Sequence, residues 1–557
     1  MFWKRQVPIF IVALIGSITL FGWFIDQPDV KEFIGDDATQ WFDVLASFAI
    51  ILGALNLIKM QIQKVLYQKP GWQYSVIAVL GFIFAIIAGF FIKGVDDSVA
   101  EWGAHVTSDG TLFKWMFDYV FSPMSATMFS LLAFFVASAS YRAFRIRNFE
   151  ATLLLVSGII IMVGRVPIGG VISSWFIMYL IVLFLGIYVN SIKKDKKVTF
   201  IFVAVGLSLV TIAGTIMGWP IDQPGIFYLP SIQEWIYYYP NVAGARAIMI
   251  GIGLGIFATS IRYILGIERS YIGVNNIKDI ENIFLKIGKI DRRWIFIIIA
   301  VVVIIPLIIP IGLPIRATDT SKSVYDALEN LPKGSNVLLS VEYSPSTKPE
   351  NHPMTISVLR HLFRNDHKVY VTCLWPDGQF MAQDALNQVA EGEFNKVYGQ
   401  DYVLLGYRPG GEAVVKGIVS NIRKLFSVDA RQTKVDEIPM MDGIKNFKDF
   451  DFLFSASAGY PGTIEWVQYA SDPTGIPMSS GVTSIQVNEV MPYVQSGQMV
   501  GVLAGMPGAA EYESLIGQKG SATSGMDAQS VAHLVIVLFI VLGNISYFID
   551  RKRSRKY

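Results

Sequence analysis

Acidic, hydroxyl and basic side chains follow the short β-rich segments of residues 316–528, at points where a strand would end. In open α/β sheets, ligands bind beyond the carboxyl ends of the strands, where the following loops meet. Glycine there lets the backbone approach an anion, and a helix N-terminus offers free N–H groups. The candidate ligand-binding residues are Glu342, Ser344, Trp375, Asp377, Arg408, Gly410, Gly411, Gly459 and Gly508. Arg408 beside Gly410-Gly411 is the best candidate pair for an anion.

These residues also have structural interpretations, which the sequence leaves open. Strand–glycine–helix turns are ordinary in α/β domains, and the chain has no Walker A, GxGxxG or GxSxG motif. Ser344 and His352 are close in the sequence, but no third residue is assigned to orient the histidine, so a hydrolase triad is a minor alternative. Cys373 falls in a predicted buried strand and is interpreted as core. We therefore assign no catalytic residue.

A second constellation is the segment Gly-Trp-x-Ile-Asp-Gln-Pro, which begins at Gly22 and again at Gly218. Each copy closes an apolar run, and the next apolar run begins at Trp41 or Trp235, with a looser third copy at Trp115. This spacing predicts duplicated helical hairpins. The polar residues of the repeat are Asp26, Gln27, Asp222 and Gln223. They suit either a paired cation or proton site or, as we favour, a turn at the membrane interface.

The composition is that of a membrane protein with a smaller soluble part. Of 557 residues, 53% are hydrophobic and 16% are charged, whereas soluble proteins carry roughly 25% charged residues. The net charge of +2 gives no argument for a nucleic-acid partner. One cysteine excludes an intramolecular disulfide, and the five histidines lack metal-ligand spacing, so we expect no cofactor and no metal site.

Ten apolar runs of about 20 residues are long enough to cross a bilayer as helices. They lie at 7–25, 42–60, 73–93, 125–141, 149–166, 171–191, 198–218, 243–265, 294–315 and 530–549. Lys and Arg follow every even-numbered run, and acidic residues dominate the opposite loops, so the even-numbered ends face the cytoplasm. We expect a multi-pass protein of the prokaryotic cytoplasmic (inner) membrane, with both termini inside and residues 316–528 outside.

The segment 316–528 alternates short β-rich runs with amphipathic helical runs, as a doubly wound (Rossmann-like) α/β domain does. Predicted strands lie at 336–341, 368–374, 402–406, 450–454, 481–486 and 499–503, and predicted helices at 354–363, 381–390, 412–426, 463–469 and 509–516. The predicted domains are a nine-helix transmembrane domain at 1–315, an extracytoplasmic α/β domain at 316–528, and a last transmembrane helix with a basic tail at 529–557.

Four short segments carry a resemblance to a known family. They are Arg142-Ala143-Phe144-Arg145-Ile146-Arg147-Asn148, Glu268-Arg269-Ser270-Tyr271, Leu405-Gly406-Tyr407-Arg408-Pro409-Gly410 and Gly508-Ala509-Ala510-Glu511-Tyr512-Glu513. Through them the chain resembles an uncharacterised family of prokaryotic multi-pass membrane proteins with an extracytoplasmic α/β domain of unknown function. The resemblance implies a shared bundle-plus-outer-domain plan. It implies no functional residue, because the family has no assigned activity.

Three classes of function fit these features. We favour a non-enzymatic component of a cell-envelope assembly, because a domain tethered at both ends holds a partner, or another copy in a homo-oligomer, at a defined height above the lipid bilayer. The alternative is a transporter or receptor whose outer domain binds a small ligand, with anions among the candidates. The second alternative is a membrane-bound enzyme acting on envelope lipids or glycans. Scarce charge within the spans counts against ion-coupled transport.

Overall fold

The protein is described from a computed structural model. The structure describes residues 6–22, 25, 27, 38–96, 102–143, 149–193, 195–218, 228–264 and 292–554. The chain divides into two compact units. The first comprises residues 1–128, 246–280 and 323–502, and the second comprises residues 129–245, 281–322 and 503–557.

Long apolar helices dominate the chain outside the sheet. Among the described residues, six helical stretches are long and apolar enough to cross a membrane: Trp72–Phe90, Leu112–Ser140, Pro167–Gly186, Lys197–Met217, Leu229–Arg262 and Ser521–Leu542. Three shorter apolar helical stretches are Ile9–Gly22, Ala151–Gly164 and Ile295–Ile308. Each of the ten predicted apolar runs overlaps a helix, and the run at 294–315 extends beyond its helix, which ends at Ile308. The ten-span topology stays a prediction. The helices concerned are α1 (Val7–Gly22), α3 (Ala38–Leu66), α4 (Trp72–Phe90), α6 (Ser122–Ala143), α7 (Phe149–Gly164), α8 (Pro167–Lys193), α9 (Lys196–Met217), α11 (Val242–Ile264), α12 (Arg292–Ile308) and α21 (Ser521–Ser554).

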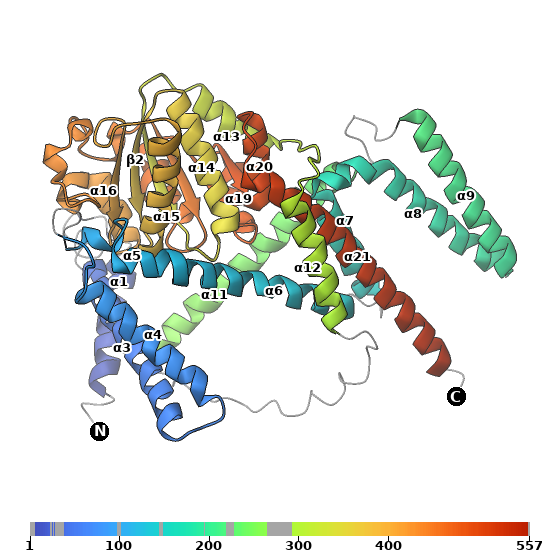
Figure 1. Ribbon diagram of the computed structural model, residues 1–557, viewed down its shortest axis with the longest axis horizontal. Coiled ribbons are helices and arrows are strands. Elements are labelled where there is room, and N and C mark those ends of the chain that lie inside the picture. Colours follow the sequence, from blue (N-terminus) through green and yellow to red (C-terminus); the bar gives the residue numbers. More distant parts are fainter. Residues whose placement is uncertain are drawn as a thin grey trace. The chain divides into compact units, whose positions relative to one another are not determined.

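A six-stranded sheet forms the centre of the α/β region (Figure 1). Its strands are β1 (Asn336–Glu342), β2 (Lys368–Cys373), β3 (Tyr402–Tyr407), β4 (Phe452–Ser457), β5 (Met478–Val482) and β6 (Gly501–Ala504). The spatial order is β3-β2-β1-β4-β5-β6, and β1 runs parallel to both β2 and β4. This order is typical of doubly wound sheets, in which the direction of winding changes between β1 and β4.

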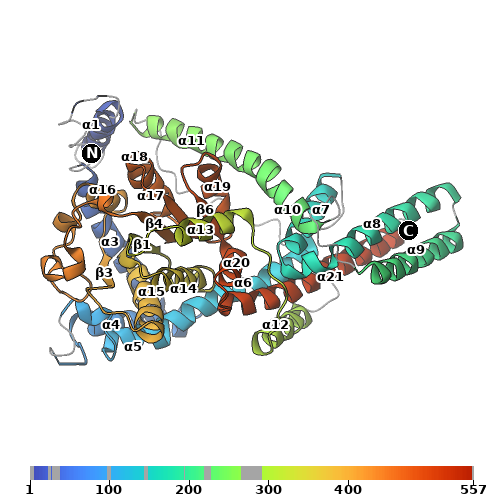
Figure 2. The same ribbon diagram turned by 90° about the horizontal axis from the view of Figure 1, so that it is seen from above.

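Helices cover both faces of the sheet, which explains why its strands are buried along nearly their whole length. Figure 2 shows α14 (Lys348–Arg364) and α15 (Pro376–Leu386) on one face, and α17 (Thr463–Trp466) and α19 (Val487–Gln495) on the other. On the second face, α16 (Glu412–Leu425) packs with the π-helical segment that follows α17. The amide of Asn351 on α14 donates to the carbonyl groups of Ser457 at 3.0 Å and Gly481 at 3.3 Å, joining the ends of β4 and β5.

One predicted strand was misplaced. The sequence pattern predicts the fifth strand at 481–486, whereas β5 spans Met478–Val482. Its residues Ser479 and Ser480 are fully buried. Buried hydroxyl groups need partners inside the protein, and the hydroxyl of Ser480 lies 2.7 Å from that of Thr463. A strand with Ser, Ser and Gly at its centre has the local composition of a loop, so its position depends on these tertiary contacts.

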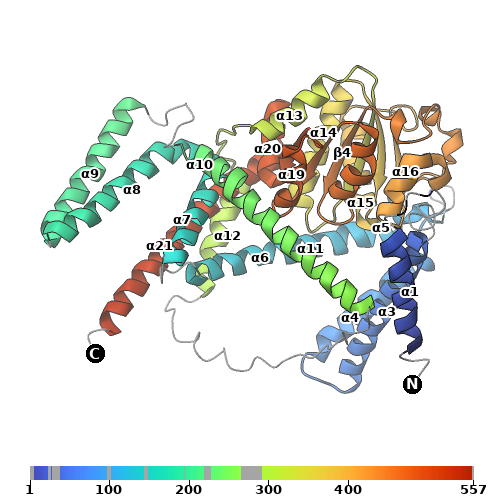
Figure 3. The same cartoon turned by 180° about the vertical axis from the view of Figure 1, so that it is seen from behind.

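Two copies of the predicted repeat share a local geometry. In each, a short helix leads through a five-residue π-helical turn into a long apolar helix, as Figure 3 shows for α10 and α11. The elements are α5 (Leu112–Met116), η4 (Phe117–Phe121) and α6 in one copy, and α10 (Leu229–Ile236), η5 (Tyr237–Asn241) and α11 in the other. The ring centroids of Trp115 and Tyr119 are 6.0 Å apart at an interplanar angle of 37°, and those of Trp235 and Tyr239 are 6.2 Å apart at 37°. The two copies therefore share one local geometry, and the duplicated hairpins stay a prediction.

The second unit has its own apolar core. Ala137 on α6, Ile295 and Ile299 on α12 and Phe539 on α21 are buried against one another. Where α7 ends and α8 begins, α10 packs closely on both helices. This junction of helix ends brings polar residues of the second unit together.

Candidate functional site

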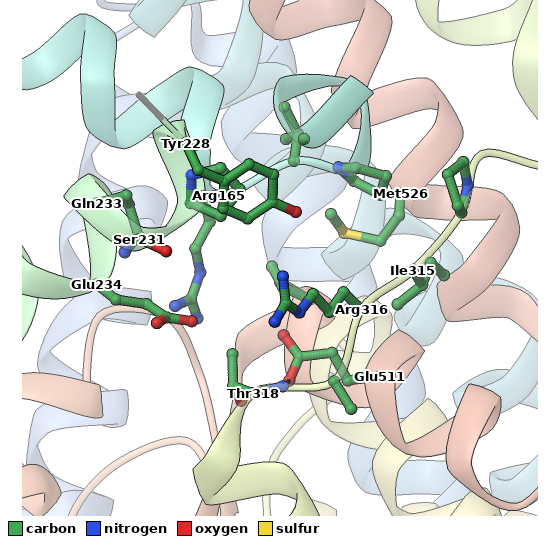
Figure 4. Close-up of a pocket in the computed structure, with 18 of the residues that line it drawn as sticks. Arg165, Tyr228, Ser231, Gln233, Glu234, Ile315, Arg316, Thr318, Glu511 and Met526 are labelled. Carbon is green, nitrogen blue, oxygen red and sulfur yellow. Dashed lines mark hydrogen bonds between the residues drawn. The ribbon is translucent and has the colours of Figure 1, made fainter. Parts of the chain in front are cut away.

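A cavity of about 620 Å³ lies in the second unit, where several helices begin or end (Figure 4). Its wall combines the α7–α8 junction, α10, residues 314–322, and parts of α20 (Gly505–Leu515) and α21. The polar side chains of the wall are Arg165, Tyr228, Ser231, Gln233, Glu234, Arg316, Thr318, Asp319, Lys322 and Glu511. A cavity of this size accommodates a small molecule or a lipid headgroup.

A glycine at the end of α7 allows α10 to approach. A Cβ atom on Gly164 would lie 2.6 Å from the Cβ atom of Gln233 and 2.9 Å from the carbonyl oxygen of Leu229. The hydroxyl of Ser173 on α8 accepts a hydrogen bond from the backbone N–H of Leu229 at 3.1 Å. Because only glycine permits this approach, the next residue, Arg165, is held at the cavity wall.

Two guanidinium groups, those of Arg165 and Arg316, point into the cavity from different segments of the chain (Figure 4). Arg165 donates to the carbonyl oxygen of Ala504 at 2.8 Å, and its guanidinium carbon lies 5.7 Å from the ring centroid of Tyr237. The guanidinium carbon of Arg316 lies 5.5 Å from the ring centroid of Tyr228. Within the part of the chain that the structure describes, neither guanidinium forms an ion pair with a carboxylate. Their planar sets of N–H donors suit a phosphate or carboxylate group.

Three carboxylates lie among these cations. Glu511 is buried, and one of its oxygens accepts hydrogen bonds from the backbone N–H of Thr318 at 3.0 Å and from its hydroxyl at 2.6 Å. Asp319 pairs with Lys322 at 3.4 Å. Glu234 accepts no hydrogen bond among the described residues and stands in the cavity wall (Figure 4). Glu511 and Asp319 are therefore engaged by residues 318–322, whereas Glu234 offers an acceptor to a ligand hydroxyl or ammonium group.

Two further carboxylates hold segments that border the cavity. Asp527 on α21 accepts hydrogen bonds from the backbone N–H groups of Gly312 at 2.8 Å and Leu313 at 3.1 Å. Glu513 accepts four hydrogen bonds from residues 520–523, at the start of α21. A site whose surrounding backbone is fixed in this way is organised before a ligand arrives.

Of the residues predicted from the sequence, Glu342 lies at the end of β1 and is completely buried. Its carboxyl group is hydrogen-bonded to the hydroxyls of Ser340 and Ser455, the latter at 3.1 Å, and to the indole N–H of Trp466 at 3.3 Å. Burial raises the pKa of Glu342 to about 8. Because the group is sealed within its own hydrogen-bond network, Glu342 belongs to the core of the domain.

The structure brings Trp375, Gly459 and Gly411 together around Pro461. The indole N–H of Trp375 donates to the carbonyl oxygen of Pro461 at 2.9 Å, and a Cβ atom on Gly459 would lie 3.1 Å from the Trp375 ring. A Cβ atom on Gly411 would lie 3.8 Å from the ring of Pro461. Gly410 and Gly411 have φ angles of 134° and 53°, which side-chain-bearing residues rarely adopt. These glycines are therefore required by the turn into α16.

Arg408 is engaged by the fold. Its guanidinium donates to the carbonyl oxygens of Tyr407 at 3.2 Å, Leu425 at 3.3 Å and Val428 at 3.2 Å, and it lies 4.9 Å from the ring centroid of Phe426. Burial lowers the pKa of Arg408. This geometry gives Arg408 a structural role at the end of β3, and anion binding by it stays a prediction.

Ser344, Asp377 and Gly508 do not line the cavity. The hydroxyl of Ser344 lies 2.7 Å from that of Ser346. Asp377 lies in the first turn of α15, and burial raises its pKa. Gly508 lies on α20, where a Cβ atom would meet the backbone of Leu503. Of the repeat residues, Gln27 is exposed, whereas Asp26, Asp222 and Gln223 lie outside the described residues.

His352 contacts Tyr343 and Asp384 rather than Ser344, the residue considered as its partner in a hydrolase. Its Nδ1 lies 2.8 Å from the hydroxyl of Tyr343, and its Nε2 lies 3.5 Å from the carboxylate of Asp384. Asp384 also accepts a hydrogen bond from the ammonium group of Lys348 at 2.5 Å. Burial, assisted by the charge of Lys348, lowers the pKa of His352 to about 4. The Ser344–His352 pair is not formed, because Tyr343 and Asp384 engage the imidazole.

The sequence analysis did not assign Arg316 or Glu234 to a site. Their positions were the one feature of the sequence that could have pointed to a binding site: Arg316 directly follows an apolar run, and Glu234 directly precedes Trp235. A charged residue at the end of an apolar run more often extends to the interface than binds a ligand. The role of Arg316 and Glu234 in a binding site becomes apparent only because they line the same cavity as Arg165.

The helices, the sheet and the cavity together define a helical protein with several membrane-capable helices and a parallel six-stranded α/β sheet. No protein-family model, no curated protein and no solved structure matches the chain. The resemblance to a prokaryotic membrane-protein family therefore stays a hypothesis.

Proposed function

We propose that this chain is a multi-pass membrane protein that binds a ligand carrying a phosphate or carboxylate group in the cavity at the ends of α7, α8 and α21. The observation that carries the proposal is the pair of guanidinium groups, Arg165 and Arg316, that face this cavity without an ion-pair partner among the described residues. Guanidinium groups bind such anions through paired, charge-assisted hydrogen bonds. Glu234 accepts a hydrogen bond from a hydroxyl or ammonium group of the same ligand.

The proposal places the cavity on the outer side of the membrane. In a ten-span arrangement with both termini inside, α7 ends, α8 begins and α21 begins on that side. Lipid headgroups and soluble anions of the cell envelope both reach this level. The Rossmann-like domain at 316–528 contributes Glu511 of α20 to the wall. This function belongs to the transporter-or-receptor class, and the envelope-assembly role stays a prediction.

The test is ligand binding by the full chain and an Arg316→Gln variant in lipid nanodiscs. Arg316 is chosen because it makes no hydrogen bond within the described residues, so its removal leaves the wall intact. Loss of a charge-assisted hydrogen bond, about 1.5–3 kcal/mol, predicts about ten- to hundredfold weaker binding. The matched control is Arg364→Gln, whose guanidinium lies 3.9 Å from Glu329 and does not line the cavity.

Two arms of the experiment separate the sources of the anion. Titration with inorganic phosphate, pyrophosphate and succinate reports on soluble ligands through the unfolding temperature. Native mass spectrometry of particles prepared with phosphatidylglycerol reports on a bound lipid. The proposal is contradicted if the Arg316→Gln variant, the control and the parent show equal shifts of the unfolding temperature with the soluble anions and also retain equal amounts of phosphatidylglycerol.

A further inference from the structure

The carboxyl edge of the sheet lies against a short helix next to a membrane-capable one, all within the first unit. Phe380 follows the carboxyl end of β2 by seven residues, near the start of α15. Its ring stacks on Phe117 of η4, with 3.8 Å between ring centroids and an interplanar angle of 13°, and lies 6.2 Å from Phe113 of α5. A Cβ atom on Gly89, at the end of α4, would lie 3.3 Å from the ring of Phe113. The rings of Phe113 and Phe380 therefore lie between the end of α4 and α15, the helix that follows β2.

Two large apolar side chains on the same edge are exposed. Tyr460 follows β4 and is 71% exposed, and Ile485 follows β5 and is 79% exposed. Both loops are held in place. Gly459 packs on the ring of Trp375, and the backbone N–H and hydroxyl of Ser484 donate to Glu350 at 2.7 and 2.9 Å. The fold therefore fixes the loops that display both apolar groups.

We propose that Tyr460 and Ile485 rest in the interfacial layer of the bilayer, so that the carboxyl edge of the sheet faces lipid. Continuity with the end of α4 favours this occupant, because a helix of that length and apolarity ends at the membrane surface. Tyrosine is enriched at this depth, where its ring meets acyl chains and its hydroxyl meets water. Exposed apolar loops beside a membrane span lose unfavourable contact with water when lipid covers them.

The inference is independent of the cavity in the second unit, because none of its residues lines that cavity. Ligands of open α/β sheets bind beyond the carboxyl ends of the strands. A ligand of this edge would therefore arrive from the bilayer surface, and the chemical class that fits is an amphiphile.

The experiment uses the full chain in vesicles of phosphatidylethanolamine and phosphatidylglycerol, spin-labelled at Ile485→Cys or Tyr460→Cys. The native thiol of Cys373 is buried, so it is not labelled in the folded protein, and mock labelling of the parent verifies this. Val397→Cys is the matched control, because Val397 is 50% exposed and precedes β3 at the opposite edge. Collision rates with oxygen, which partitions into lipid, and with a water-soluble nickel chelate are then compared.

We expect the oxygen-to-nickel collision ratio at 485 and 460 to be several-fold higher than at 397. A ratio equal to that of the control would show that the edge faces water and would overturn the inference. Protection from both reagents would show that protein covers the edge, a partner or a second copy, and would overturn it as well. Unchanged elution of each variant from a sizing column confirms that it is folded.

Discussion

Replacing Glu342 by Gln tests whether the carboxyl group at the end of β1 is protonated in the folded protein. One oxygen is hydrogen-bonded to Ser340 and Trp466, and the other to the hydroxyl of Ser455. A Gln amide has nearly the shape of a protonated carboxyl group. Its oxygen accepts from Ser340 and Trp466, and its NH₂ group donates to Ser455. The substitution therefore preserves the network and removes the titration.

The expected difference in the free energy of unfolding between the variant and the parent follows from the pKa of Glu342 in the folded and unfolded chains. Burial raises this pKa from 4.5 to about 8, so the unfolded chain releases its proton at lower pH than the folded one. Between these values, the stability of the fold falls by about 1.4 kcal/mol for each pH unit. The contribution is fully present below a pH of about 4.5 and is lost as the pH rises to about 8, which amounts to about 5 kcal/mol. The Gln variant lacks this loss, so we expect it to exceed the parent in stability above about pH 6.

Hydrogen exchange followed by mass spectrometry measures this difference in the full chain. Peptides covering β1 and β4 report the opening free energy of the domain, and each rate is corrected for the intrinsic effect of pH. Glu437→Gln is the control, since Glu437 is exposed and pairs with Lys434 at the surface. An infrared band of a protonated carboxyl group at neutral pH, absent from Glu342→Gln, gives independent support. Identical pH dependence of exchange in parent and variant would refute the reasoning.

Two further substitutions test structural roles. Arg408→Ala leaves three carbonyl groups near β3 and α16 without their donor, so we expect a loss of about 2–4 kcal/mol in the local opening free energy. Exchange of peptides around residues 402–428 measures it, and an unchanged rate would show that water replaces the guanidinium. Glu513→Gln replaces one acceptor oxygen by a donor at the start of α21, so we expect about 1–2 kcal/mol less protection there. Exchange at residues 518–525 measures it, and equal protection in variant and parent would contradict the assigned role.

The sequence predicted the α/β strands where the local pattern was apolar. Strands β1 to β4 lie within two or three residues of their predicted bounds, because runs such as Val337-Leu338-Leu339 have few alternatives to a buried strand. The fifth strand was misplaced because Ser479, Ser480 and Gly481 give it the local composition of a loop, and the buried hydroxyl of Ser480 has its partner, Thr463, on another element. The π-helical turns η4 and η5 follow equivalent tryptophans, so the repeat was recognisable although its geometry was not.

The candidate site was harder to predict than the fold. Glu342 and Arg408 have the residue types and positions of ligand-binding groups, yet their hydrogen-bonding capacity is used within the domain. Whether a polar group is available depends on which neighbours satisfy it. For Arg408, two of those neighbours lie 17 and 20 residues further along the chain. Spacing within a motif does not contain that information.

By itself, the sequence determined the apolar helices and the position of the sheet between the last two of them. These features follow from hydropathy and periodicity along the chain, which are local properties. Only the tertiary structure decided that Arg165 and Arg316, far apart in the sequence, face one cavity, while Arg408 is held by backbone carbonyls. The physical reason is that the free energy of a polar group depends on its burial and its partners, and both are set by segments brought together in the fold.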